Sequence, residues 1–464
     1  RQAFTFFPES ARALSEVDPE MHVTLLSMAE ELVGRSAVAA MEFLKSPPAV
    51  LGRVGLEEIL HWHSEGSSLL DSSSEGGEAY FRMESSRGEE VLDSLSSRVD
   101  LSRVSDVLRM YCKALTGTEV AIHSSEALAE KGIGWVGTES PTTEGTAIFL
   151  APWVGEFPRK EDNFSVYKVY STHQAGHLEF STFGFNFERE GRIFPNLRRK
   201  LETERGRTSQ PQSGDGEDQA PAGPLTDMER FFDLFEGRRL ASDLFAVVED
   251  SRIDALVERE YAGIRTTYRQ RQQVELERRP AVEKLPLLQA FVENLVRASL
   301  GGMDRIRWPK PLVPVMQNAV GIIAAVRQPQ AIVEDSAEAT IRLYQLAREI
   351  PNILSELMDQ EEWQALDEEM MQVLPMTSDT LGESMDIDFP QVSPMPYESP
   401  QPVDFRGDFK PEMVQLLMRL RQERGGEQGP LSPLSPEQLR AMLEKSAEIS
   451  LSDLAEADLT QSSG

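Results

Sequence analysis

The chain has 464 residues, 40% of them hydrophobic, and its 77 acidic and 47 basic side chains give a formal net charge of −30. Nucleic acids and anionic membranes are recognised through clustered Lys and Arg, so this charge argues against either partner. The single cysteine, Cys112, excludes an internal disulfide and a cysteine-ligated metal cluster, and we expect a reducing, cytoplasmic compartment.

Membrane and export signals are missing from the sequence. No apolar run approaches the roughly 18–20 residues that a bilayer span requires, so we expect no membrane span. The first segment lacks the charged-then-apolar order of a secretory leader. Because the sequence begins at Arg1 rather than at a methionine, we expect a processed or partial chain.

Residues 1–110 are predicted to be a helical, repeat-like region. Apolar residues recur at three- and four-residue spacing in segments 25–33 and 56–60, which is typical of amphipathic helices. Segments 41–51 and 79–92 share a similar order of apolar and polar residues at an offset of about 38 residues, a period in the range of helical-hairpin repeats. We therefore expect a short array of helical hairpins.

Residues 111–202 are predicted to hold a small β element beside a helix. The runs 119–123 and 146–150 are β-prone and are bounded by Gly, Pro, Ser and Thr. The helix is expected to begin near Asn163, which follows two acidic residues and would serve as its cap.

This helix carries a histidine pair, His173 and His177. A spacing of four places both imidazoles on one helix face, so both can reach a single ion. The pattern is that of the zincin motif H-E-x-x-H, but Gln174 replaces the glutamate that activates the zinc-bound water. An amide has the shape of a carboxylate but does not accept a proton near neutral pH. The sequence thus predicts a zinc site without the usual general base.

A third ligand is expected on a later helix, because a gluzincin takes it from a downstream glutamate. Glu249 is the best candidate, since it follows an apolar stretch that predicts a packed helix. Asp254, just over one turn later, is a candidate partner for a ligand histidine. Glu179 lies about 160° from His177 around its helix, which excludes it. The predicted metal ligands are therefore His173, His177 and Glu249.

The rest of the chain divides by composition. Residues 203–225 are rich in Gly, Pro, Ser, Gln and charge, which predicts a disordered insertion. Residues 226–350 are predicted to be a helical core with a capping-box start at Thr226. Residues 351–464 are acidic and proline-rich, which predicts a largely disordered tail with one short helix over 435–445. Within the core, amphipathic helices are expected around 266–278, 281–300, 313–327 and 334–350.

Five short blocks, in order, resemble the N-terminal region of NorD/CbbO-type proteins. They are Tyr111–Gly117, Asp162–Phe164, Thr172–Phe180, Glu249–Asp254 and Tyr261–Arg265. Members of that family carry a C-terminal von Willebrand factor A domain and act with a MoxR-class AAA+ ATPase to remodel or activate a metalloenzyme, such as nitric oxide reductase or Rubisco. The resemblance implies an adaptor or co-chaperone role. The chain departs from the family pattern because it has no Asp-x-Ser-x-Ser adhesion motif.

Three functions stay open. The first is a non-enzymatic adaptor of an AAA+ ATPase and a client metalloenzyme, built on an inactive zincin-like core. The second is a zinc metallopeptidase with an atypical general base, and the third is a metal-free helical scaffold in which both histidines are hydrogen-bonded core residues. The predicted fold class is mainly α, with N-terminal helical-hairpin repeats followed by a zincin-like helical core that includes a small β element.

Overall fold

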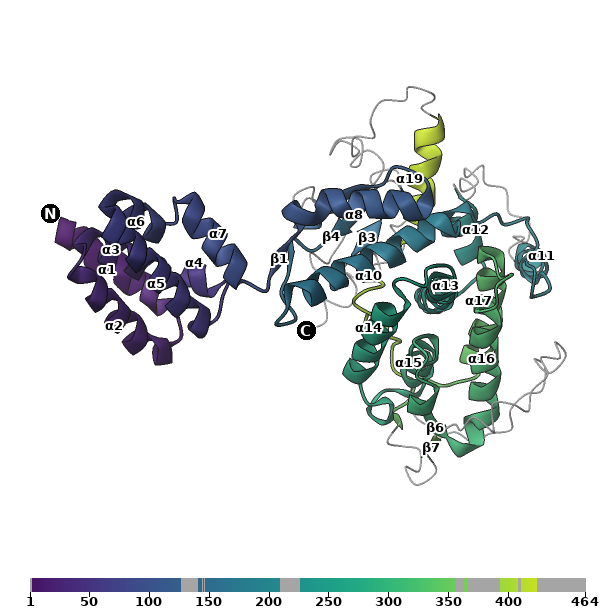
Figure 1. Ribbon diagram of the computed structural model, residues 1–464. Coiled ribbons are helices and arrows are strands. Elements are labelled where there is room, and N and C mark those ends of the chain that lie inside the picture. The colour runs from purple at the N-terminus through teal and green to yellow at the C-terminus, as the bar shows by residue number, and fades with distance from the viewer. Residues whose placement is uncertain are drawn as a thin grey trace, which may run out of the picture. The chain divides into compact units, whose positions relative to one another are not determined.

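The protein is mainly helical, as predicted, and divides into two compact units (Figure 1). Unit 1 consists of Arg1–Val104 and Trp153–Ser165, and unit 2 of Ser105–Pro152 and Val166–Gly464. No helix in the described part of the chain is long and apolar enough to cross a membrane. The computed structural model describes residues 2–126, 141–143, 145, 147–208, 226–355, 363–365, 393–407 and 410–423.

Unit 1 opens with a run of short helices. N-cap serines begin three of them: Ser36, Ser73 and Ser85 each accept a hydrogen bond from a backbone N–H three residues later. The helices are α1 (Gln2–Ser15), α2 (His22–Val33), α3 (Ala37–Lys45), α4 (Pro47–Leu51), α5 (Leu56–Ser72), α6 (Ser74–Phe81) and α7 (Ser86–Leu95), with a 3₁₀ turn, η1 (Pro19–Met21), before α2.

An aromatic cluster forms the centre of unit 1. Trp62 of α5 is fully buried, and its ring centroid lies 5.1 Å from Tyr80 and 5.3 Å from Phe81. Phe43 of α3 packs edge-on against Phe81 of α6 at 5.8 Å. These two phenylalanines are 38 residues apart, the offset of the two similar segments. Each of the two similar segments therefore places a phenylalanine, Phe43 or Phe81, in the same core.

Close packing around Gly66 of α5 gives a stability prediction. A β-carbon at Gly66 would lie 2.5 Å from Phe81 Cζ and 2.7 Å from the Tyr80 ring. We expect Gly66→Ala to destabilise unit 1 by up to about 2 kcal/mol, because overpacking costs more than the gain in helix propensity returns. Hydrogen exchange of peptides from α5 and α6, read by mass spectrometry, should become faster. Gly34→Ala is the matched control, since its nearest neighbour would be 3.9 Å away; unchanged exchange in Gly66→Ala contradicts the packing.

The helix that carries the histidine pair, α10 (Lys160–Glu179), begins three residues before the predicted cap at Asn163. The Asn163 side chain accepts a hydrogen bond from the Phe157 N–H and donates to the carbonyls of Phe157 and Ser97, each at 2.8 Å. It therefore closes the preceding loop rather than capping the helix. Nearby, β1 (Val99–Asp100) pairs antiparallel with β5 (Trp153–Val154), and α8 (Leu101–Thr116) follows β1.

The predicted small β element is confirmed in unit 2. Its strands are β2 (Ala121–Ser124), β3 (Thr142–Thr143) and β4 (Ala147–Leu150), in the order β2-β4-β3. Strand β4 runs parallel to β2 and antiparallel to β3. The Tyr167 hydroxyl of α10 donates to the Ala151 carbonyl at 2.7 Å, which fixes the histidine-bearing helix at the end of β4.

The helical core of unit 2 contains helices at the predicted positions, except that the helix expected over 281–300 begins at Leu287, after a 3₁₀ turn. Helix α13 is its centre, packing against α15, α16 and α17 (Figure 1). Thr226 caps α12 by accepting from the Glu229 N–H at 3.1 Å, as predicted. The elements are α11 (Arg198–Thr208), α12 (Asp227–Phe232), α13 (Arg238–Glu260), α14 (Arg265–Arg278), α15 (Leu287–Ser299), α16 (Val313–Val326), α17 (Val333–Arg348), α19 (Pro411–Glu423), the 3₁₀ turns η2 (Thr182–Gly184), η3 (Val282–Lys284), η4 (Met303–Arg305) and η5 (Lys310–Leu312), and the antiparallel pair β6 (Arg307–Pro309) and β7 (Trp363–Ala365).

The structure differs from two predictions of disorder. Helix α11 continues to residue 208, into the predicted insertion 203–225, whose residues 209–225 lie outside the described ones. In the predicted tail, residues 393–407 and α19 pack on unit 2, because Val403, Phe405 and Val414 are apolar and become buried. The predicted helix over 435–445 lies outside the described residues.

Candidate metal centre

Three side chains from two helices meet in the interior of unit 2. His173 and His177 come from α10 and Asp250 from α13, with exposed fractions of 0%, 1% and 6%. The two Nε2 atoms of the histidines lie 3.2 Å apart. Asp250 Oδ1 lies 3.5 Å from each of them. The three atoms therefore form a nearly equilateral triangle.

This triangle has the dimensions of one face of a tetrahedral metal site. Zinc bonds to nitrogen and carboxylate oxygen are about 2.0–2.1 Å long, which places neighbouring ligand atoms of a tetrahedron roughly 3.3 Å apart. Asp250 Oδ1 is buried and makes no hydrogen bond. A buried carboxylate oxygen without a hydrogen-bond donor is stabilised by a cation. The donor set of two imidazoles and one carboxylate fits a divalent metal ion such as zinc.

Asp254 fixes the orientation of His173. The His173 Nδ1 lies 3.1 Å from Asp254 Oδ1 and 2.8 Å from the Tyr268 hydroxyl, which itself donates to Asp254 Oδ1 at 2.6 Å. An Nδ1–H directed at this carboxylate leaves the Nε2 lone pair facing the centre, the usual arrangement of a carboxylate, a histidine and a metal. Asp254 therefore has the role that the sequence predicted for it.

A hydroxyl orients the second histidine. His177 Nδ1 lies 3.1 Å from Thr182 Oγ1 in η2. The Thr182 hydroxyl donates in turn to Glu249 Oε1 at 2.5 Å. Its oxygen is thus left to accept from His177 Nδ1–H, which turns the Nε2 lone pair of this histidine toward Asp250.

Glu249, the predicted third ligand, lies outside the triangle. Its carboxylate forms an ion pair with Arg252, whose Nε donates to Oε2 at 2.8 Å. The Ser336 hydroxyl of α17 also donates to Oε2, at 2.7 Å. Its oxygens are therefore occupied by donors, and it acts on the site only through Thr182.

Asp250, which the sequence reasoning missed, takes the place beside the histidines. Asp250 and Asp254 are four residues apart, so they share one face of α13, and both contact His173. Glu249 and Arg252 share a neighbouring face. The spacing of Asp250 from Asp254 was the signal available in the sequence, because a residue that orients a ligand histidine indicates which face of the helix points at the site.

Burial and charge set the ionisation of the three groups. Burial alone would raise the pKa of Asp250, but the two imidazoles outweigh it and lower this pKa to about 2. Burial lowers the pKa of His177. For His173 burial acts in the same direction, but Asp250 and Asp254 outweigh it and raise the pKa. Asp250 is therefore a carboxylate near neutral pH, the form that binds metal.

Gln174, in the position of a zincin's general base, faces a backbone carbonyl. Its side chain is buried, and Nε2 donates to the carbonyl oxygen of Arg406 at 2.7 Å. Arg406 belongs to the segment 403–407, which the sequence placed in a disordered tail. The residue in the position of the general base therefore does not accept a proton near neutral pH, and its side chain is already bonded to Arg406.

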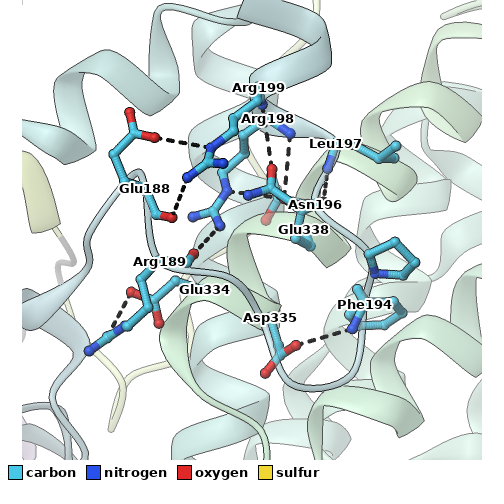
Figure 2. Close-up of polar contacts among 12 residues, drawn as sticks. Glu188, Arg189, Phe194, Asn196, Leu197, Arg198, Arg199, Glu334, Asp335 and Glu338 are labelled. Carbon is cyan, nitrogen blue, oxygen red and sulfur yellow. Dashed lines mark hydrogen bonds and ion pairs between the residues drawn. The ribbon is translucent and has the colours of Figure 1, made fainter.

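The loop between η2 and α11 is anchored on α17 by three buried carboxylates (Figure 2). Asp335 Oδ1 accepts from the Phe194 N–H at 3.2 Å, and Glu338 accepts from the Leu197 N–H at 2.9 Å and from Arg198 Nε at 3.0 Å. The third carboxylate, Glu334, accepts from a loop N–H at 2.9 Å. Because the same turns of α17 carry Ser336, this helix holds both the loop and Glu249.

No family model, no curated protein and no solved structure matches this chain. The site is therefore interpreted from its own geometry and chemistry.

Gly176 of α10 allows the two ligand-bearing helices to approach each other. A β-carbon there would lie 2.9 Å from Ile253 Cγ2 and 3.3 Å from Val257 Cγ2 of α13. We expect Gly176→Ala to move His177 away from Asp250 and to weaken zinc affinity about tenfold, since overpacking costs about 1–3 kcal/mol and 1.4 kcal/mol corresponds to a factor of ten. Competition with a chromophoric chelator measures this affinity.

The matched control is Gly321→Ala in α16, where a β-carbon would have no neighbour within 4 Å. It should keep the zinc affinity of the wild type and gain about 0.5–1 kcal/mol in helix stability. Equal affinity in Gly176→Ala and the wild type would show that the approach of the helices does not set the geometry of the site.

Proposed function

We propose that unit 2 is a metal-binding, zincin-like module without peptidase activity, and that the protein acts as an adaptor through contacts with other proteins. One observation carries this proposal. His173, His177 and Asp250 form a triangle of donor atoms with edges of 3.2 and 3.5 Å, while an amide, Gln174, stands where a general base belongs. The donors favour metal binding, and the amide disfavours hydrolysis.

The arrangement supports a structural role for the metal. A zinc ion in this place would link α10 to α13 and supply Lewis acidity. His173 and His177 are almost fully buried, which leaves little room for a substrate. Gln174 neither accepts a proton nor is free, since it donates to the Arg406 carbonyl. These features argue against the metallopeptidase alternative, which would require chelator-sensitive cleavage of an unfolded protein.

Elemental analysis of the purified chain tests the metal site. We expect about one zinc ion per chain in the wild type and a loss of zinc in His173→Ala and Asp250→Asn, because each removes a donor atom. Glu249→Gln is the control: it leaves the triangle intact, so zinc should remain, with affinity reduced by about 10–100-fold at most.

The outcomes separate the alternatives. A zinc-free wild type would exclude the metal-binding module and the metallopeptidase, and would leave a metal-free helical scaffold whose adaptor role is tested separately. Zinc that is lost in Glu249→Gln and kept in Asp250→Asn would restore Glu249 as the third ligand.

Two features support the adaptor role. The five sequence blocks resemble proteins that act with MoxR-class AAA+ ATPases on a client metalloenzyme. Helix α2 of unit 1 also exposes apolar side chains, with exposed fractions of 74% for Val23, 49% for Leu26 and 58% for Val33. Neighbouring apolar side chains on a surface are typical of protein–protein contacts. The acidic charge of the chain favours a partner with a basic surface.

Co-elution with a MoxR-type ATPase in size-exclusion chromatography tests this role. We expect a complex that binds a client metalloenzyme, and an affinity at least tenfold lower in the double variant Val23→Glu, Leu26→Glu, because the two charges interrupt the apolar face of α2. Val107→Glu, at another exposed apolar position, is the control and should bind as the wild type does. The absence of any complex would contradict the adaptor role.

A further inference from the structure

Residues 403–407, with the sequence Val-Asp-Phe-Arg-Gly, lie beside the candidate metal centre and contact Gln174, Asp254, Glu275 and Ser299. We call the side chains that surround this segment the cleft. They belong to no helix or strand and form a turn, in which the backbone N–H groups of Arg406 and Gly407 donate to the Val403 carbonyl at 3.0 and 3.2 Å. The side chains of Val403, Phe405 and Arg406 are buried. The segment is therefore held in unit 2 by contacts of its individual side chains rather than by regular secondary structure.

The cleft holds the backbone of this segment at two points. Gln174 Nε2 donates to the Arg406 carbonyl at 2.7 Å. Glu275 Oε2 accepts from the Asp404 N–H at 3.1 Å. Hydrogen bonds of this kind hold a peptide backbone whatever its side chains.

One pocket of the cleft recognises a guanidinium group. Asp254 Oδ2 accepts from an Arg406 Nη2 at 2.6 Å, and Ser299 Oγ accepts from Nη1 at 2.8 Å. Asp254 and Ser299 are fully buried. A buried carboxylate with a neighbouring hydroxyl is selective for arginine, because its planar group presents several donors at once.

A second pocket recognises an aromatic ring. The ring of Phe405 meets the ring of His173 edge-on, with centroids 5.4 Å apart and planes at 90°. Tyr268 contacts Phe405 from another side at 5.3 Å and 73°. Edge-to-face contacts at these distances are favourable beyond the burial of apolar area. The cleft is thus selective for an aromatic residue followed by arginine.

We propose that this cleft is a recognition site for a partner peptide that carries an aromatic residue followed by arginine, and that residues 403–407 are its resident occupant. The inference deepens the proposed adaptor function, on which it rests for the partner, and names the chemistry of the segment that unit 2 binds. The resident segment competes at the high effective concentration of an attached ligand, so a partner peptide gains access when that segment is displaced.

Gly407 offers a way to displace the segment without altering the cleft. Its φ is +72°, and a β-carbon there would lie 1.8 Å from the Pro141 carbonyl oxygen. Gly407→Ala therefore forces the turn formed by residues 403–407 out of the cleft. Gly301→Ala is the matched control, because Gly301 also has a positive φ, +84°, but a β-carbon there would have no neighbour within 4 Å.

The test is the binding of a fluorescent, end-capped Val-Asp-Phe-Arg-Gly peptide to the full chain, measured by anisotropy. We expect Gly407→Ala to bind it at least tenfold more tightly than the wild type and Gly301→Ala do. A peptide with alanine in place of arginine should bind Gly407→Ala at least tenfold more weakly. Equal binding of the peptide to Gly407→Ala and the wild type, or equal binding of both peptides, would overturn the proposal.

A second variant covers the case in which Gly407→Ala does not fold. Arg406→Ala leaves Asp254 without its guanidinium partner, and we expect the arginine peptide, but not its alanine version, to raise the melting temperature of this variant. An unchanged melting temperature would overturn the proposal.

Zinc content is measured on the same samples. Peptide binding without zinc contradicts only the proposed metal module, and zinc without peptide binding contradicts only this inference.

Discussion

The burial of negative charge on α13 is the constraint on which unit 2 depends. Glu249, Asp250 and Asp254 lie within about one and a half turns of one helix, and all three are buried. A buried carboxylate is unfavourable unless donors or cations surround it. Glu249 is compensated by Arg252 and Asp254 by Arg406, whereas Asp250 lies 3.5 Å from each of two imidazoles and is the carboxylate that a bound cation would compensate. The elements around α13 are therefore positioned by the charges they must compensate.

The same constraint explains why the two histidines of α10 are held in fixed orientations. The candidate ligand histidines are oriented by Asp254 and by Thr182, and these in turn are held by arginine, tyrosine and Glu249. Such a network stabilises the fold whether or not a reaction occurs, because each member satisfies a buried neighbour. Gln174 adds to this network its bond to the Arg406 carbonyl, whereas loss of a histidine would remove a neighbour of Asp250.

The helices, the small β element and the histidine pair could be predicted from the sequence, because each depends on local periodicity. The third donor was missed, since Glu249 and Asp250 are adjacent and the rotation of α13 about its axis decides which one faces His173. The four-residue spacing between Asp250 and Asp254 was the indication of that face in the sequence. Residues 403–407 also escaped prediction. Their composition is that of an acidic, proline-rich tail, and the bond from Gln174 to Arg406 joins residues 232 positions apart. Contacts of that sequence separation leave no local pattern.

Asp254 is shared by the candidate metal centre and the proposed peptide cleft, since one of its oxygens faces His173 and the other Arg406. Thermodynamic reciprocity then applies to them. If the segment in the cleft changes the affinity of the histidines for a cation by some factor, the cation must change the affinity of the cleft by the same factor. Through this one carboxylate, the binding equilibrium of the peptide and the binding equilibrium of the ion would be coupled, so a change in one would change the other.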